Sequence, residues 1–171
     1  MRTLYLLRHA KSSWADPGLV DHERPLAPRG IRDAKRLAKH LRRSGVAPAL
    51  VLCSTARRTQ ETLELVRPSL GTAVVQLEDG LYGAAAEQLL SRIRAVPDEV
   101  EAVLLVGHNP AVQDLTLLLA AEGARLADIR AKLPTGALAT LETSAASWSA
   151  LDENGARLVD YVVPKELGDS A

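Results

Sequence analysis

Short apolar runs alternate with segments of helical periodicity along most of this chain. The runs lie at residues 4–7, 49–53 and 101–106, and none of the three shows the alternation of a half-exposed strand. A further short strand is predicted at 73–77. An uninterrupted apolar run of this length is typical of a strand buried on both faces. Strands that alternate with helices predict a mostly parallel central sheet covered on both faces, a three-layer α/β/α fold.

The intervening segments carry ordinary helix signals. Pro28 is suited to open a helix and Gly45 to end it, and between them one apolar stripe is formed by Ile31, Ala34, Leu37, Ala38 and Leu41. Further helices are predicted at 56–70, around Leu89 to Ile93, and from Pro110 to about residue 121. Strands are predicted at 137–141 and 157–163, as a hairpin with a turn at 152–155.

Length and composition limit the number of domains and the kinds of partner that this protein can have. A chain of 171 residues without a linker or repeat predicts one domain, residues 1–171. The 21 basic and 21 acidic side chains cancel, so neither a nucleic acid nor a membrane is expected as a partner. Cys53 is the single cysteine, and no apolar run approaches the ~20 residues of a membrane span. We therefore expect a cytoplasmic protein.

Polar residues with anion-binding chemistry follow three of the predicted strands. Arg8 and His9 end the first strand, Ser54 ends the second with Arg57 and Arg58 just beyond it, and His108 follows the strand at 101–106. Ligands of an open parallel sheet bind beyond the carboxyl ends of its strands. Histidines and arginines gathered there suit a small, multiply charged anion, and phosphate fits the guanidinium fork best.

These residues carry a family resemblance. Leu7-Arg8-His9-Ala10, Ser54 with Arg58 and Thr62, and Gly107-His108-Asn109 resemble three motifs of the histidine phosphatase superfamily, in its order and over nearly the whole chain. The segment from Arg8 to Trp14, followed by Arg24-Pro25-Leu26 and Gly30, is similar to the short SixA-type phosphohistidine phosphatases. The resemblance implies a phosphoglycerate mutase-like fold. Residues 77–89 leave no room for the large lid subdomain of longer members, so an open site is expected.

The resemblance also implies a mechanism. His9 would attack phosphorus and form a covalent phosphohistidine, which requires one neutral ring nitrogen while the other donates to a backbone carbonyl. Phosphate would be bound by Arg8, Arg24, Arg58 and by His108, the last as a cation. No metal and no cofactor are implied, because the arginines supply the positive charge. Asp79 is spaced like the proton donor of the mutases, Glu78 is an alternative, and a phosphohistidine substrate would need neither.

Three functions remain open at this stage. The first is a phosphatase acting on phosphohistidine in a partner protein, the second a phosphatase of small phosphate esters, and the third a phosphate-binding or scaffold domain without turnover. A mutase is disfavoured because it needs an enclosed pocket.

Simpler roles compete for single residues. His9 or His108 could be structural, Arg24 could be an ion-pair partner within its loop, and Asp79 could be an ordinary loop carboxylate. The side chains of Arg57, His22 and His40 are expected to face solvent. Trp14 and Trp148 are expected to pack in the core or at its rim. Cys53 lacks the arginine six residues later that cysteine-dependent phosphatases need, since Thr59 stands there.

Overall fold

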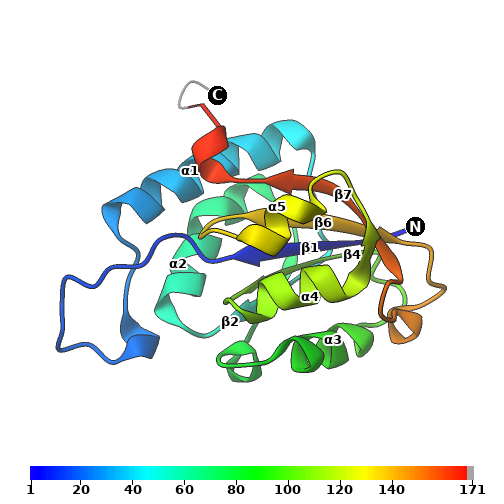
Figure 1. Cartoon of the computed structure of the whole chain (residues 1–171). Coiled ribbons are helices and arrows are strands. Elements are labelled where there is room, and N and C mark those ends of the chain that lie inside the picture. The colour runs from blue at the N-terminus through cyan, green and yellow to red at the C-terminus, as the bar shows by residue number, and fades with distance from the viewer. Residues whose placement is uncertain (169–171) are drawn as a thin grey trace.

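A computed structural model describes residues 1–168 and contains a seven-stranded sheet in the order β3-β2-β4-β1-β6-β7-β5 (Figure 1). Four of its pairings, β1 with β4, β2 with β3, β2 with β4 and β5 with β7, are parallel. Only β6 runs antiparallel to its two neighbours. The strands are β1 (Arg2–Arg8), β2 (Leu50–Ser54), β3 (Val74–Glu78), β4 (Ala102–Gly107), β5 (Ala120–Glu122), β6 (Leu138–Thr143) and β7 (Ala156–Val162).

Helices cover both faces of the sheet. They are α1 (Pro28–Ser44), α2 (Arg57–Val66), α3 (Ala86–Arg94), α4 (Ala111–Leu119) and α5 (Leu126–Ala131). Leu37 of α1 and Leu63 of α2 share one core cluster with Leu7 of β1. Leu89 of α3 and Val112 of α4 share the other with the alternating strand position Leu6. The predicted three-layer α/β/α arrangement with a mostly parallel sheet is confirmed.

The register of the central strands decides which residues meet at the sheet edge. Arg8 at the end of β1 pairs with Gly107 at the end of β4, and Cys53 of β2 pairs with Val106 of β4. The residues that follow these pairs, His9, Ser54 and His108, therefore emerge side by side. They come from segments far apart in the sequence because the parallel strands end at one edge.

Several local predictions need correction. Ile31 was expected on the buried stripe of α1 but is 38% exposed, because the helix turns Ala34, Leu37 and Leu41 toward the core instead. The helix predicted to run to about residue 121 ends earlier: α4 ends at Leu119, and Ala120 and Ala121 belong to the three-residue strand β5. The short helix α5 was not predicted, and the link between β6 and β7 also contains the 3-10 turn Trp148–Ala150.

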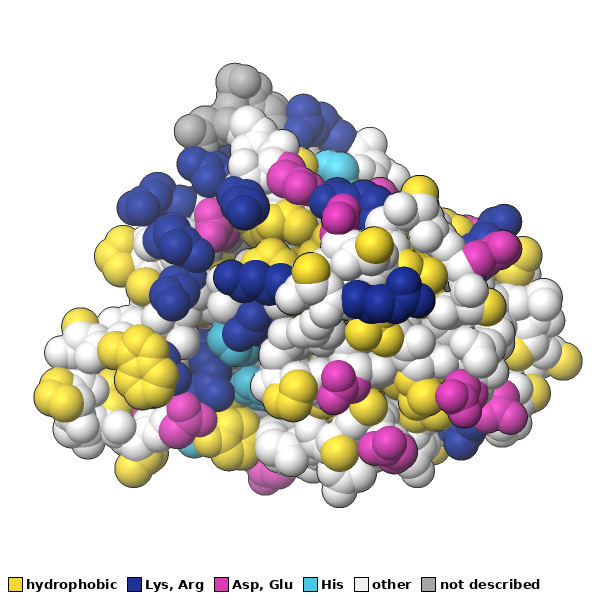
Figure 2. Space-filling model, viewed as in Figure 1, with side chains coloured by type: hydrophobic (Ala, Val, Ile, Leu, Met, Phe, Trp, Pro, Cys, Tyr) yellow, Lys and Arg dark blue, Asp and Glu magenta, His cyan; other side chains and the backbone are white. Residues whose placement is uncertain are grey.

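The connection between β3 and α3 is short. It contains one 3-10 turn, Asp79–Leu81, and four further residues before α3, so no lid subdomain covers this end of the sheet. The site at the strand ends therefore opens to the surface, where Figure 2 shows the histidine side chains at the bottom of a hollow. None of the helices in residues 1–168 is long and apolar enough to cross a membrane.

Candidate active site

Two imidazole rings form the centre of the site. The ring centroids of His9 and His108 lie 5.3 Å apart, tilted by 57°. The adjacency of the β1 and β4 ends produces this distance, because each histidine directly follows its strand. The two predicted histidines are thus brought together at the carboxyl edge of the sheet.

The surroundings of His9 fix its protonation state and tautomer. The side chain is buried, and its Nδ1 lies 2.7 Å from the carbonyl oxygen of Ala10. Burial, together with His108, Arg58 and Arg8, lowers the pKa of His9 to about 3, although the Ala10 carbonyl acts in the opposite direction. At neutral pH the ring is therefore uncharged. Since a carbonyl oxygen only accepts hydrogen bonds, Nδ1 carries the proton and the lone pair is on Nε2.

His108 is neutral as well. Burial and the nearby Arg58 lower its pKa to about 4. His108 was expected from the sequence to be a cation, but in the free protein at neutral pH its surroundings favour the uncharged ring. Its Nε2 lies 2.8 Å from the hydroxyl oxygen of Ser54, the residue at which β2 ends. A positively charged His108 would require an anion bound beside it.

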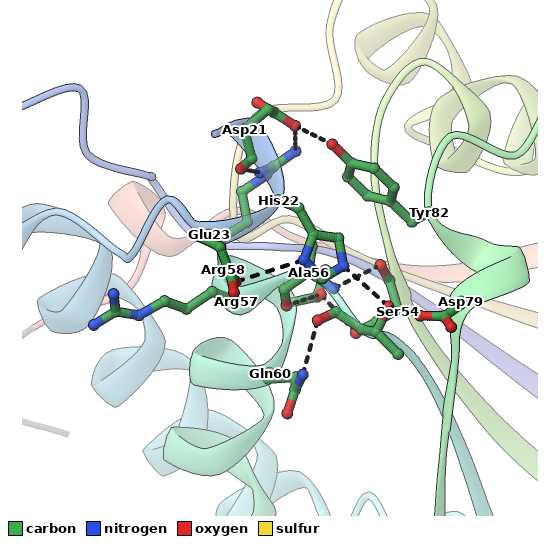
Figure 3. A network of polar contacts seen from close by, with 12 residues as sticks. Asp21, His22, Glu23, Ser54, Ala56, Arg57, Arg58, Gln60, Asp79 and Tyr82 are labelled. Carbon is green, nitrogen blue, oxygen red and sulfur yellow. Dashed lines mark hydrogen bonds and ion pairs between the residues drawn. The ribbon is translucent and has the colours of Figure 1, made fainter. Parts of the chain in front are cut away.

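Arg58 is held by a carboxylate that sequence analysis did not identify. Its guanidinium donates at 2.8 Å to the carbonyl oxygen and at 3.0 Å to the carboxylate of Asp21. The hydroxyl of Tyr82 donates to the same carboxylate at 2.6 Å (Figure 3). Tyr82, Arg58 and Arg24 hold the pKa of Asp21 well below its usual range, so this carboxylate is ionised.

Arg24 lies in the loop that precedes α1 and is buried. It donates at 2.6 Å to the hydroxyl of Ser12 and at 3.1 Å to the carboxylate of Asp21. Its guanidinium carbon is 3.2 Å from the ring centroid of Trp14, which is itself 72% exposed at the rim. Arg24 is therefore held by an ion pair and by an aromatic ring, and Trp14 is not in the core.

Arg8 reaches the same region from β1. It donates at 2.9 Å to the carbonyl oxygen of Leu133, and burial and the neighbouring Arg58 lower its pKa. Two buried polar atoms of the site, Nε of Arg8 and Nδ1 of His108, have no hydrogen-bond partner among the described residues. Native interiors contain few such atoms, and each calls for a structural or catalytic explanation.

The two candidate acids differ in their surroundings. The carboxylate of Glu78 is bound by both Nε and Nη2 of Arg92, at 2.7 Å and 2.9 Å. Asp79 instead accepts a hydrogen bond at 2.5 Å from Thr55, which follows Ser54. Asp79 is exposed and lies beside the site, whereas Glu78 is held by α3. Geometry favours Asp79 of the two.

Other candidates lie outside the centre or at its edge. Arg57 pairs with Glu61 on the surface of α2, and His40 lies 3.3 Å from the hydroxyl oxygen of Ser44. Cys53 is buried, and burial raises the pKa of its thiol to about 12. His22, expected in solvent, reaches the hydroxyl oxygen of Thr55 at 3.1 Å and stacks edge-on against Tyr82. In residues 1–168 no cluster of three or more His, Cys, Asp or Glu side chains could hold a metal ion.

Sequence reasoning missed Asp21 and Tyr82. One signal was present: Asp21 stands three residues before Arg24, in the segment that resembles SixA-type proteins. Tyr82 follows Asp79 in the motif that was considered only for its acid.

Comparison with known proteins agrees with this geometry. The profile of the histidine phosphatase superfamily (branch 1) matches residues 4–82. An uncharacterized protein of Mycobacterium tuberculosis is 39% identical over 163 residues, covering 93% of this chain and 100% of the relative.

Two solved structures assigned to the SixA phosphohistidine phosphatases are also similar. The protein from Nakamurella multipartitia is 34% identical with a TM-score of 0.84, and covers 95% of this chain and 96% of its own. The protein from Agrobacterium tumefaciens is 33% identical with a TM-score of 0.80, over 95% and 98%. The chain belongs to the histidine phosphatase superfamily and, within it, to the SixA type.

Proposed function

We propose that this phosphatase hydrolyses phosphohistidine in a partner protein, with His9 as the nucleophile. The observation that carries the proposal is the neutral ring of His9, whose Nδ1 is occupied by the Ala10 carbonyl and whose Nε2 is left as a free base beside Arg58 and His108. An uncharged imidazole held in one tautomer is the form that can attack phosphorus.

The reaction has two displacements. The substrate ring is protonated from solvent on its other nitrogen, Nε2 of His9 attacks the phosphoryl group, and the P–N bond breaks to release neutral imidazole. Water then attacks the phosphoryl group on His9, the new P–N bond breaks, and inorganic phosphate leaves while His9 returns to its neutral form. Arg8, Arg24, Arg58 and His108 stabilise the charge on the equatorial oxygens. A bound phosphoryl dianion would favour protonation of His108, which the protein alone does not.

The substrate class is supported by the shape of the site and by its relatives. The short link from β3 to α3 leaves the site open to a protein surface. The similar structures from Nakamurella and Agrobacterium are assigned to phosphohistidine phosphatases. Imidazole also leaves more readily than an alkoxide, so the exposed position of the candidate acid Asp79 suits a P–N bond.

The test is rapid quenching of the reaction with a phosphohistidine peptide. Wild-type protein should accumulate a phosphoenzyme that is stable to base and labile to acid, as phosphohistidine is. His9→Ala should form none and lose at least about 10³-fold in turnover. Arg57→Ala, which changes a surface arginine next to Arg58, should behave as wild type. Turnover retained by His9→Ala would overturn the nucleophile assignment.

A small phosphate ester is the second candidate substrate. It is favoured by one observation, the position of Asp79, which is held by Thr55 next to the site and could protonate an alkoxide. Comparing turnover of a phosphohistidine peptide with that of sugar phosphates separates the two substrates.

A further inference from the structure

A groove of about 420 Å³ beside the active site is lined by an unusual excess of basic side chains. Three come from α1, one from the segment after α5 and one from the segment after β7. These residues define the basic groove: Arg29, Arg32, Arg36, Lys132 and Lys165. Asp33 is the one acidic residue among those lining it.

Ion pairs within residues 1–168 do not match every cation of the groove. Asp33 is buried and lies 3.7 Å from Arg29 and 3.4 Å from Arg36. Arg32 and Lys132 form no ion pair with any residue of the described chain. The whole chain has a formal net charge of zero, so the basic side chains are concentrated in the groove rather than spread evenly over the protein.

Neighbouring acids are engaged elsewhere. Glu166 adjoins Lys165, but its carboxylate receives two hydrogen bonds of 3.0 Å from Arg125. Asp128 of α5 also pairs with Arg125, at 2.9 Å. The basic groove therefore has a positive electrostatic potential, which would attract an anionic partner.

The groove lies next to the backbone that follows the nucleophile. The start of α1 packs on the backbone next to the nucleophile, since a Cβ on Gly30 would lie 2.1 Å from the carbonyl oxygen of Lys11. On the other side, a Cβ on Gly136 would lie 2.9 Å from Pro164 in the groove and 3.9 Å from Cα of Ala10. Figure 2 shows Lys and Arg side chains extending over this face to the histidines in the hollow.

We propose that the basic groove binds an acidic surface of the phosphoprotein substrate and so presents its phosphohistidine to His9. The inference rests on the proposed function, because it names the partner of that same site. A protein segment suits the dimensions, since the groove residues of α1 run from Arg29 to Arg36, about 10 Å along the helix. Among the described residues that line the groove, none is aromatic and could stack on bases, and none is an exposed apolar side chain that could enter a lipid layer.

The probes are two peptides with one central phosphohistidine, made by chemical phosphorylation. One has Glu and Asp on both sides of the phosphohistidine and the other has Ser and Gln. We expect kcat/KM for the acidic peptide to exceed that for the neutral one by about tenfold at low ionic strength, through KM rather than kcat. The preference should vanish in 0.5 M NaCl, where the screening length is only a few ångströms.

The variant is Arg32→Gln combined with Lys132→Gln, which removes two charges from the groove and touches none of the residues around His9. It should lose the preference for the acidic peptide and keep wild-type turnover of the neutral one. The matched control, Arg43→Gln with Arg67→Gln, removes two exposed charges away from the groove and should keep the preference.

Binding is measured separately, by fluorescence anisotropy of the unphosphorylated acidic peptide with His9→Ala protein. Failure of wild-type protein to turn over either phosphopeptide would overturn the proposed function. Equal binding of the acidic peptide by the groove variant and the control would overturn the docking inference, whatever the turnover. Groove-dependent binding to phosphatidylserine vesicles in place of the acidic peptide would overturn it too.

Discussion

Arg58 makes two hydrogen bonds to Asp21, one to its carbonyl oxygen at 2.8 Å and one to its carboxylate at 3.0 Å. Tyr82 and Arg24 bind the same carboxylate, so the site contains an internal anion where its arginines converge. A phosphoryl group that enters must share these donors with Asp21. The carboxylate therefore both orients Arg58 and opposes the binding of a second anion.

We expect Asp21→Asn to bind inorganic phosphate more tightly. The amide can still accept hydrogen bonds from Arg58 and Tyr82, but one negative charge that repels phosphate is lost. The inhibition constant of phosphate as a competitive inhibitor should fall by about threefold to tenfold at low ionic strength. Steady-state kinetics at pH 7 measure this constant.

Glu64→Gln is the matched control, because it removes one exposed negative charge from α2 and should leave phosphate inhibition unchanged. Weaker phosphate binding by Asp21→Asn would show that the carboxylate acts mainly to orient Arg58.

The depressed pKa of His9 predicts a loss of stability in acid. The unfolded ring takes up a proton below its ordinary pKa of 6.5, whereas the folded ring stays neutral down to a pKa of about 3. As the pH falls through this window the unfolded state binds more protons, so the free energy of unfolding decreases. At pH 5 the His9 contribution to this loss amounts to about 2 kcal/mol.

Urea denaturation of wild type and His9→Gln at pH 7 and pH 5 measures this difference. The variant lacks the titrating ring, so its free energy of unfolding should decrease less between the two pH values. Equal decreases in both proteins would show that His9 takes up its proton at a similar pH in the folded and unfolded states.

The core of the site could be predicted from the sequence because topology places it. Apolar runs located β1, β2 and β4, and the residues immediately after parallel strands must meet at one edge. His9, Ser54 and His108 follow from that rule alone. The first turn of the helix after β2 offered both Arg57 and Arg58, and the family resemblance, through its spacing from Ser54, selected Arg58.

Asp21 could not be predicted in the same way. It belongs to a long polar loop without periodicity, and its role depends on how that loop returns to Arg58, 37 residues later. Strand β5 has three residues and α5 six, which is too short for a hydrophobic period to be recognised. Their structure is set by tertiary packing, as is the outward orientation of Ile31.

Gly30→Ala should destabilise the protein although alanine is the better helix former. The new Cβ would lie 2.1 Å from the carbonyl oxygen of Lys11, and backbone on both sides leaves little room to move. The gain in helix propensity is about 1 kcal/mol, and the overlap costs about 1–3 kcal/mol or more. Urea denaturation should show the net loss.

Gly80→Ala is the control, because its new Cβ would meet nothing within 4 Å, and its effect on stability should be near zero. Equal stability of the two variants would contradict the close approach of α1 to Lys11.

Asp79→Asn should separate the two substrate classes. The carboxylate accepts a hydrogen bond from Thr55, so it is held beside Ser54 and can reach a leaving group at the mouth of the site. An alkoxide needs a proton as it leaves, and general acids contribute about 10²-fold or more to such reactions. Imidazole leaves without that help. We therefore expect a loss of about 10²-fold on a sugar phosphate and less than about threefold on a phosphohistidine peptide.

Glu78→Gln is the matched control for this prediction. It alters the neighbouring carboxylate, which is bound by Arg92 at 2.7 Å and 2.9 Å and is not available to a leaving group. Turnover of both substrates should therefore change little. A large loss in Asp79→Asn on phosphohistidine as well would show that the acid takes part in cleavage of the P–N bond, and the leaving imidazole would then have to receive its proton from Asp79.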